Sequence, residues 1–210
     1  MKLIDKKTKK EIFEYIVKNY NTINFSELDK NKYFSKIKEF NYFDSAQIFD
    51  HLSDIFLEQL NLEELYKVKS IDKLSSLTKK IEIILTEKLK NDFEVRSQIK
   101  KIFFEIVKQG HVLKLTKYFF DISNIIWIMV KDQSTDFNYY TKRFSLISVY
   151  LKILCAILLK EKFKKEDIQK EVSKTLEQLK HITKLKPKFS IFEDIQKFFS
   201  QFKTQQGRGF

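Results

Sequence analysis

The chain has 210 residues, of which 43% are hydrophobic and 32% charged, so it can bury a core and is not disordered throughout. Three glycines and one proline leave few positions for tight turns and bulges, which excludes a fold built on β-hairpins. The formal net charge of +12 indicates either an anionic partner, such as nucleic acid or a membrane surface, or a biased composition, because only three of the 40 basic residues are arginine. We therefore expect an all-α fold.

The single cysteine and the lengths of the apolar stretches indicate whether the chain forms disulfides or spans a membrane. Cys155 is the only cysteine and lies in an apolar stretch, so we expect a buried small hydrophobic side chain and no intrachain disulfide. The first ten residues contain an acid and no apolar run, unlike a targeting segment. The longest near-apolar stretch, 144–159, contains Lys152 and is shorter than the ~18 uncharged residues of a spanning helix. We expect a soluble or peripheral protein.

Three helices are predicted at the N-terminus. The first covers Lys6–Tyr20, with a capping box of Thr8 and Glu11. The second runs from Ser26 to about Phe40, and Asp44 or Ser45 caps a third. They form either a helix-turn-helix unit or a plain helical subdomain. The sequence favours the second interpretation, because the expected turn has no glycine and no arginine precedes Arg96.

A short helix is predicted for Leu62–Ser70, followed by helices over Ile71–Lys90 and Val95–Gln109. Gly110 is free to take a left-handed backbone conformation and is expected to end the last of these.

The two most apolar helices follow. They are predicted for Val112–Val130 and for about Phe137–Lys160, joined by a polar turn from Asp132 to Asp136, and should pack antiparallel. Phe, Ile and Leu around most of both helices form either a packed core or the lining of a cavity for a hydrophobic ligand, and the core is the commoner case.

The C-terminal part combines a charged helix, Asp167–Lys184, with a last helix that begins after Pro187 and is capped by Ser190 and Glu193. The last helix has one sharp apolar face beside a lysine-rich stretch, which is typical of a membrane-surface helix. The same face also fits docking onto the domain or onto a second subunit. The six side chains of this face are Ile191, Phe192, Ile195, Phe198, Phe199 and Phe202.

Catalytic motifs are not found. His51, His111 and His181 are solitary, so no metal site is predicted, and the glycines do not form a phosphate loop. Asp121, Asp132 and Asp136 are either an acid/base cluster or helix caps paired with lysine and arginine, and capping is the commoner use. We predict no catalytic residue, no metal and no cofactor.

The stretch Trp127–Arg143 reads WIMVKDQSTDFNYYTKR. It resembles the signature of the coenzyme-Q-biosynthesis protein nine family, which is approximately Trp-x-x-x-Gly-Asp-x-Ser-Thr-Asp-x-Asn-Trp-Tyr-Thr-Lys/Arg-Arg. The resemblance covers about 110–159 and extends more weakly to 184. Two positions depart from it: Tyr139 replaces the usual Trp, and Lys131 replaces the usual Gly, which predicts a differently shaped turn.

The resemblance implies a TetR-like helical bundle, usually a homodimer. It comprises helix-turn-helix-like N-terminal helices over 1–65, a helical lipid-binding domain over 66–186 and an amphipathic membrane-associated helix over 187–204. Such proteins are accessory proteins of ubiquinone biosynthesis and neither enzymes nor binders of nucleic acid. They bind isoprenoid lipid or quinone precursors and present them from the membrane surface to the demethoxyubiquinone hydroxylase. We expect a bacterial cytoplasmic protein peripheral on the inner membrane, or one on the matrix side of the mitochondrial inner membrane.

The alternative function is that of a TetR-family transcriptional regulator that binds DNA and a hydrophobic ligand. For the proposed function, the resemblance and the helix patterns together assign three sets of residues. The six C-terminal side chains above are assigned to the membrane. Partner docking is assigned to Asp132, Asp136, Tyr139, Lys142 and Arg143. Tyr140 is expected to point inward with Trp127 and Phe144. Lipid binding is assigned to Phe119, Ile122, Ile126, Trp127, Phe144, Ile147, Leu151 and Leu154.

Overall fold

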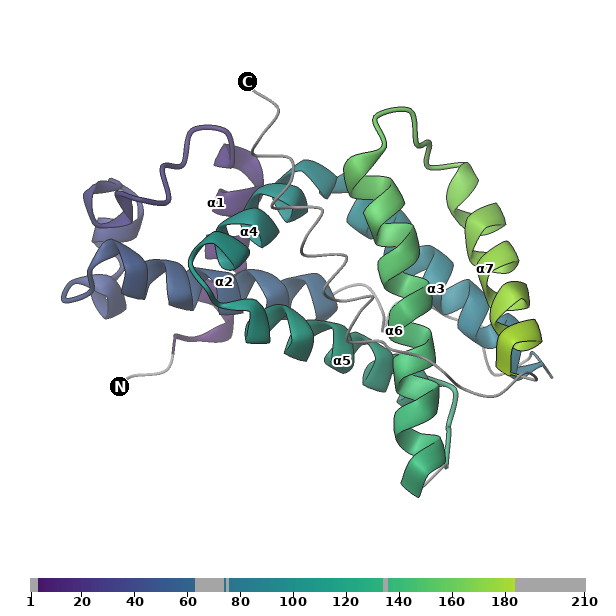
Figure 1. The fold of residues 1–210 in the computed structure, drawn as a ribbon. Coiled ribbons are helices and arrows are strands. Elements are labelled where there is room, and N and C mark those ends of the chain that lie inside the picture. Colours follow the sequence, from purple (N-terminus) through teal and green to yellow (C-terminus); the bar gives the residue numbers. More distant parts are fainter. Residues whose placement is uncertain (1–3, 63–73, 75, 134–135, 184–210) are drawn as a thin grey trace.

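The structure is a computed structural model that describes residues 4–62, 74, 76–133 and 136–183 (Figure 1). Over these ranges the chain forms seven α-helices and three short 3-10 helices, with no strand. The predicted all-α fold is confirmed. The predicted membrane helix, 187–204, and most of the short helix predicted for 62–70 lie outside the described residues, so the predicted domain boundaries stay predictions.

Helix α1 (Lys6–Asn19) begins at a different cap from the predicted one. The carboxylate of Asp5 accepts hydrogen bonds from the backbone N–H groups of Lys7 and Thr8 at 2.9 and 3.0 Å. The Thr8 hydroxyl donates to the same carboxylate at 2.6 Å. The predicted capping box of Thr8 and Glu11 is therefore wrong, because an acidic residue three positions earlier takes the cap.

The helix predicted from Ser26 to about Phe40 is also wrong. Three 3-10 turns occupy this segment: η1 (Leu28–Lys30), η2 (Phe34–Lys36) and η3 (Lys38–Phe40). Two asparagine side chains interrupt the helical ladder, since the amide oxygen of Asn24 accepts from the N–H of Ser26 at 3.1 Å and that of Asn31 from the N–H of Tyr33 at 2.9 Å. The turns bury Leu28, Phe34 and Phe40, and the interval between successive buried residues is longer than the three or four residues of an amphipathic helix.

Helix α2 (Ser45–Leu62) packs against α1 and is capped by Asp44, one of the two predicted caps. Asp44 and Gln47 form a reciprocal capping box: the Gln47 N–H donates to the Asp44 carboxylate at 2.8 Å, and the Asp44 N–H donates to the Gln47 side chain at 3.0 Å. Ser45 instead hydrogen-bonds Asp29 of η1, which ties the 3-10 segment to this helix.

Helices α3 (Leu77–Glu94) and α4 (Arg96–Lys108) follow. Helix α3 begins later than predicted, at Ser76, whose hydroxyl accepts from the N–H of Lys79. Gly110 has φ +82 and ends α4 as predicted, with the N–H of His111 donating to the Ile106 carbonyl at 2.9 Å.

Helices α5 (Val112–Met129) and α6 (Asp136–Leu159) pack antiparallel, as predicted. Tyr118 meets Tyr150, and Phe120 meets Phe144, so later residues of one helix face earlier residues of the other. Helix α7 (Asp167–Thr183) returns alongside α6 and α3 (Figure 1).

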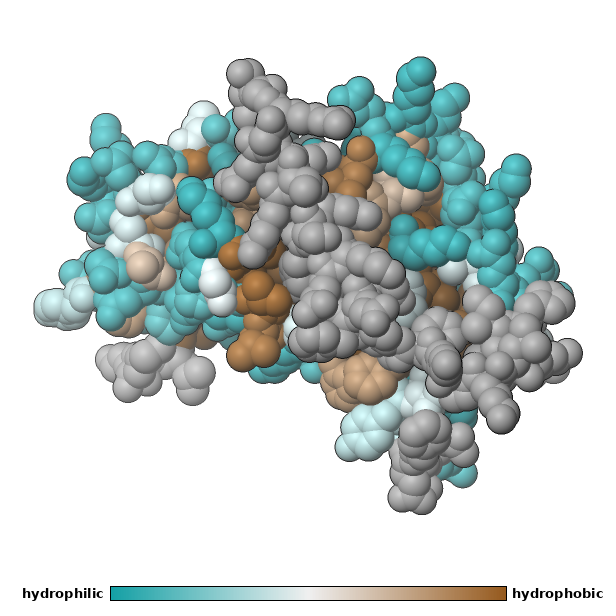
Figure 2. All heavy atoms as spheres, viewed as in Figure 1, coloured by the Kyte–Doolittle hydropathy of each residue, from teal (hydrophilic) through white to brown (hydrophobic). Residues whose placement is uncertain are grey.

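One continuous hydrophobic core extends from α1 to α7. The N-terminal elements are held to α4 by polar contacts as well: the Lys101 ammonium donates to the carbonyls of Tyr20 at 2.5 Å and Ile23 at 3.2 Å, and Gln98 donates to the Val17 carbonyl at 3.0 Å. Figure 2 shows hydrophobic side chains at the surface in the middle of one face, over α5 and α6, between hydrophilic side chains over the N-terminal part and over α7. Among the described helices, none has the length and apolar character needed to cross a membrane.

Candidate functional site

The turn between α5 and α6 contains a left-handed backbone conformation of the kind that glycine usually adopts, but the residue there is Lys131. Lys131 has φ +60, in the left-handed region. Its N–H donates to the Ile128 carbonyl at 2.9 Å, and the N–H of Asp132 donates to the Trp127 carbonyl at 3.0 Å, which is the pattern that closes a helix at a left-handed residue. The expectation of a differently shaped turn is wrong at this residue: Lys131 adopts the conformation at a cost of about 1–2 kcal/mol.

Five side chains around this turn form what we call the corner network: Asn124, Asp132, Tyr139, Lys142 and Arg143. Asp132 is its anion. The Lys142 ammonium lies 2.6 Å from one carboxylate oxygen of Asp132, and the Arg143 guanidinium lies 3.8 Å from the other. Because the carboxylate is almost fully buried, both cations are held by a desolvated partner and not by a surface charge.

Arg143 is the centre of the corner network. Its Nε donates to the side-chain oxygen of Asn124 at 3.0 Å, and a terminal nitrogen donates to the Tyr139 carbonyl at 3.1 Å. Its guanidinium lies 3.2 Å from the centroid of the Tyr139 ring, and the Tyr139 hydroxyl donates to Asn124 at 3.2 Å. The Arg143 carbonyl accepts from the Ser123 hydroxyl at 2.9 Å. The start of α6 is thereby fixed to α5.

Trp127 lies beneath the corner network. The Lys142 ammonium is 5.2 Å from the Trp127 ring centroid, and the Trp127 indole N–H is buried with no hydrogen-bond partner among the described residues. A side chain that carries both an apolar ring and an unsatisfied donor therefore separates the polar corner from the apolar interior.

The predicted docking residues differ in how far their side chains are exposed to solvent. Tyr139 and Lys142 are partly exposed, whereas Arg143 is 3% exposed and faces Asp132 and Asn124. The side chain of Asp136 lies outside the described residues. Arg143 thus positions Tyr139, and the docking role of all five residues stays a prediction.

Tyr140 corrects one prediction. It was expected to point inward with Trp127 and Phe144, but it is 55% exposed. The first turns of α6 extend beyond the neighbouring helices, so none of the described helices covers this side (Figure 1). Ile128 at the end of α5 is also exposed, and the two side chains add apolar surface on either side of the turn.

The predicted lipid-binding residues lie on α5 and α6. Phe144 is partly buried and packs edge-on against Phe120, with ring centroids 6.4 Å apart. The other seven are buried in the hydrophobic core: Phe119, Ile122, Ile126, Trp127, Ile147, Leu151 and Leu154. Their predicted place in the interior is confirmed, and lipid binding itself stays a prediction.

Sequence reasoning missed a charged group inside this core, which we call the buried ionic cluster: Lys88, Asp92, Tyr118 and Tyr150. Lys88 forms an ion pair with Asp92, and both side chains are 1% exposed. The Tyr150 hydroxyl donates to the second Asp92 oxygen at 2.6 Å, and the Tyr118 hydroxyl lies 3.4 Å from both Lys88 and Tyr150. A sequence signal existed, because Lys88 and Asp92 continue the apolar stripe of Ile84 at four-residue spacing with opposite charges.

Burial sets the protonation of this cluster. It opposes the charge on Lys88, but the Asp92 carboxylate and the Tyr118 hydroxyl together outweigh it, so the pKa of Lys88 is raised. Burial raises the pKa of Tyr118 to about 12 and holds the pKa of Tyr150 well above its ordinary value. The cluster is therefore an ion pair with two neutral phenols at physiological pH. Burial likewise raises the pKa of the half-buried Cys155 thiol to about 12, which argues against a nucleophile.

A polar groove of about 530 Å³ lies between α2 and α5, and we call it the α2–α5 groove. It touches the corner network through Asn124 and the buried ionic cluster through Tyr118. The side-chain oxygen of Asn61, which also lines the groove, is buried and has no hydrogen-bond partner within the described part of the chain. The lining residues are Asp54, Leu57, Glu58, Asn61, Lys114, Lys117, Tyr118, Asp121, Asn124 and Ile125.

No group of histidine, cysteine and acidic side chains in the part of the chain that the structure describes is arranged to hold a metal ion. Residues 112–183, which span α5, the corner network, α6 and α7, match the family model described as COQ9. This segment belongs to the COQ9 family. Membership implies a role in ubiquinone biosynthesis, and COQ9 proteins are generally non-catalytic accessory proteins. No curated protein and no solved structure matches the chain.

Proposed function

We propose that this COQ9-family protein is a lipid-binding accessory protein of ubiquinone biosynthesis. It binds an isoprenoid quinone precursor between α5 and α6 and presents it to the demethoxyubiquinone hydroxylase. One observation carries the proposal: the residues that identify the family at the start of α6 are locked onto the apolar helix α5 by Asp132, Asn124 and Arg143. A partner bound at the corner network would therefore contact residues that are hydrogen-bonded to α5, the helix that lines the apolar interior.

The docking surface is formed by Tyr139 and Lys142 together with the exposed side chains of Ile128 and Tyr140. Aromatic and apolar side chains beside a cation are typical of residues that dominate binding energy at protein interfaces. Asp132 holds Lys142 through an ion pair, and Arg143 holds Tyr139 through the backbone carbonyl and the ring. Asp136 begins the helix that carries them.

The polar ring of the precursor lies in the α2–α5 groove, with the prenyl tail among the apolar side chains of α5 and α6. The buried oxygen of Asn61 supports this assignment, because an unpaired buried acceptor costs about 1–3 kcal/mol that a ligand hydroxyl would recover.

The membrane role belongs to the last predicted helix, whose apolar face runs from Ile191 to Phe202. The lysines before it favour an anionic surface. The protein then works as a peripheral homodimer on the bacterial inner membrane, or on the matrix side of the mitochondrial inner membrane in a eukaryote.

Bound lipid tests the proposal directly. The purified protein is extracted and analysed by mass spectrometry, and a prenyl lipid is the expected result. If a cavity exists beside α5, the larger side chain of Ile126→Phe should fill it. The variant should then be purified without the lipid and with little loss of stability. Ile99→Phe in α4 is the matched control, since both isoleucines are fully buried, and overpacking a solid core there should cost about 1–3 kcal/mol.

Two outcomes would contradict the proposal. One is the absence of any prenyl lipid together with no binding to anionic vesicles. The other is an equal loss of stability in both variants, because this would make the space between α5 and α6 a packed core.

The regulator alternative is disfavoured by the segment between α1 and α2. A recognition helix must enter the major groove, and residues 20–44 contain only 3-10 turns of three residues each. With a net charge of +12 we expect weak, salt-sensitive and sequence-blind DNA binding; operator-specific binding would revive the alternative.

A further inference from the structure

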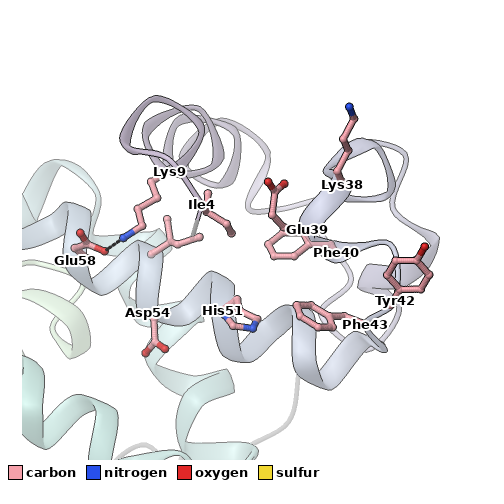
Figure 3. Close-up of a pocket in the computed structure, with 11 residues that line it drawn as sticks. Ile4, Lys9, Lys38, Glu39, Phe40, Tyr42, Phe43, His51, Asp54 and Glu58 are labelled. Carbon is pink, nitrogen blue, oxygen red and sulfur yellow. Dashed lines mark hydrogen bonds and ion pairs between the residues drawn. The ribbon is translucent and has the colours of Figure 1, made fainter. Parts of the chain in front are cut away.

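A second pocket, which we call the N-terminal pocket, lies between Ile4, α2 and the end of the 3-10 segment, far along the chain from the COQ9 segment (Figure 3). Its volume of about 670 Å³ is in the range of small-molecule sites. Its lining residues are Ile4, Lys9, Lys38, Glu39, Phe40, Tyr42, Phe43, His51, Asp54, Ile55 and Glu58.

One wall of the N-terminal pocket is a cluster of three rings, in which Phe40 is tilted by 39° from Phe43 and His51 lies nearly parallel to Phe43. The His51 imidazole stacks on Phe43 with centroids 5.1 Å apart and planes at 15°, and it lies 6.3 Å from Phe40 with planes at 24°. Phe40 is buried beside the other two rings, while Phe43 and His51 are partly exposed. Such a wall favours a flat ring that extends the stack, and the imidazole adds a hydrogen-bonding group beside it.

The charges around the pocket favour a neutral ligand. The Lys9 ammonium is paired with Glu58 at 2.6 Å, and the Lys38 side chain is directed away from the pocket (Figure 3). The Asp54 carboxylate is paired with Lys114 at 2.9 Å, and Glu39 adds a further negative charge at the rim. An anionic ligand would therefore meet the Glu39 carboxylate at the rim, while Lys9 is engaged by Glu58 and Lys38 is directed away.

We infer that the N-terminal pocket binds a neutral aromatic ring that carries a hydrogen-bonding oxygen, a compound of the phenol class. The ring stacks on Phe43 and His51, and its oxygen bonds to the imidazole. The inference does not depend on the proposed function, since it rests on a different part of the molecule.

The test uses the full-length protein at neutral pH and two probes that share a ring and an oxygen: neutral 4-methoxyphenol and anionic 4-hydroxybenzoate. The chain has three histidines, so the His51 ring resonance can be followed by proton NMR and assigned with His51→Gln. We expect 4-methoxyphenol to shift this resonance in a saturable manner and to bind at least about fivefold more tightly than 4-hydroxybenzoate, because one like charge at the rim costs about 1 kcal/mol.

Phe43→Leu keeps an apolar side chain but removes the flat ring, and it should weaken 4-methoxyphenol binding by about threefold or more. Phe104→Leu is the matched control, a partly buried phenylalanine that does not line the pocket, and should leave binding unchanged. Far-UV circular dichroism establishes that both variants fold. The inference is overturned if no saturable shift occurs at millimolar probe, if the anion binds equally well, or if the two variants behave alike.

Discussion

At the scale of single residues, Lys131 is the clearest case of a side chain held in an unfavourable backbone conformation. The family pattern has glycine at this position, and the lysine still takes φ +60. We predict that Lys131→Gly raises the free energy of unfolding by about 0.5–1 kcal/mol, because glycine adopts this conformation without steric strain. Urea unfolding followed by Trp127 fluorescence measures the change. Lys131→Ala keeps the strain and should not stabilise, so equal effects of Gly and Ala would contradict the explanation.

The buried ionic cluster makes a second prediction at this scale. Lys88, Tyr118 and Tyr150 all have pKa values raised by folding, so each holds its proton more tightly in the folded state. Their contribution to stability is complete below the ordinary pKa values near 10 and is lost as pH rises through the folded values. For Tyr118 alone, a pKa of about 12 corresponds to roughly 2–3 kcal/mol.

We therefore predict that the free energy of unfolding falls steeply between about pH 10 and pH 12. Tyr150→Phe removes one of the titrating phenols and should flatten this fall. Tyr42→Phe is the control, because the Tyr42 side chain is 96% exposed and should leave the profile unchanged. Urea unfolding at a series of alkaline pH values gives both profiles. Parallel profiles for Tyr150→Phe and the native protein would show that the cluster does not control alkaline stability.

At the scale of elements, regular apolar spacing predicted the helices well. Helix α5 begins at the predicted residue, and α4 ends at the predicted glycine, because both are defined by patterns within the element itself. The segment 26–40 was not predictable in the same way. Its apolar residues fit a helix approximately, but the side chains of Asn24 and Asn31 accept hydrogen bonds from nearby backbone N–H groups. The apolar side chains of the segment are instead buried in the core shared with α1 and α2.

The candidate site shows the same division. Helical spacing correctly placed Phe119, Ile122 and Leu154 in the interior. It also grouped Tyr139 with Arg143 on one side of α6. It did not show that Arg143 is turned inward, since that depends on Asp132 and Asn124 across the turn. Burial of a long cation depends on a tertiary partner, which no single-helix pattern contains.

At the scale of the whole molecule, the N-terminal elements and the COQ9 segment share one core. Ile12 of α1 and Leu176 of α7 belong to the same hydrophobic cluster. The Lys101 ammonium of α4, the helix before the COQ9 segment, binds the N-terminal elements through the carbonyls of Tyr20 and Ile23, and it lies 5.3 Å from the centroid of the Phe25 ring. Shared burial of this kind favours unfolding in a single transition.

We predict that Lys101→Met lowers the free energy of unfolding by about 1–3 kcal/mol, because two carbonyls lose their charged donor. Two probes report on the two parts: the His51 resonance for the N-terminal elements and Trp127 fluorescence for the COQ9 segment. In one cooperative unit both midpoints shift together in urea. Lys100→Met, an exposed neighbour on the same helix, is the control and should shift neither. A His51 midpoint that moves alone would instead establish the N-terminal elements as a separate domain, with an interface to α4 that opens before the COQ9 segment unfolds.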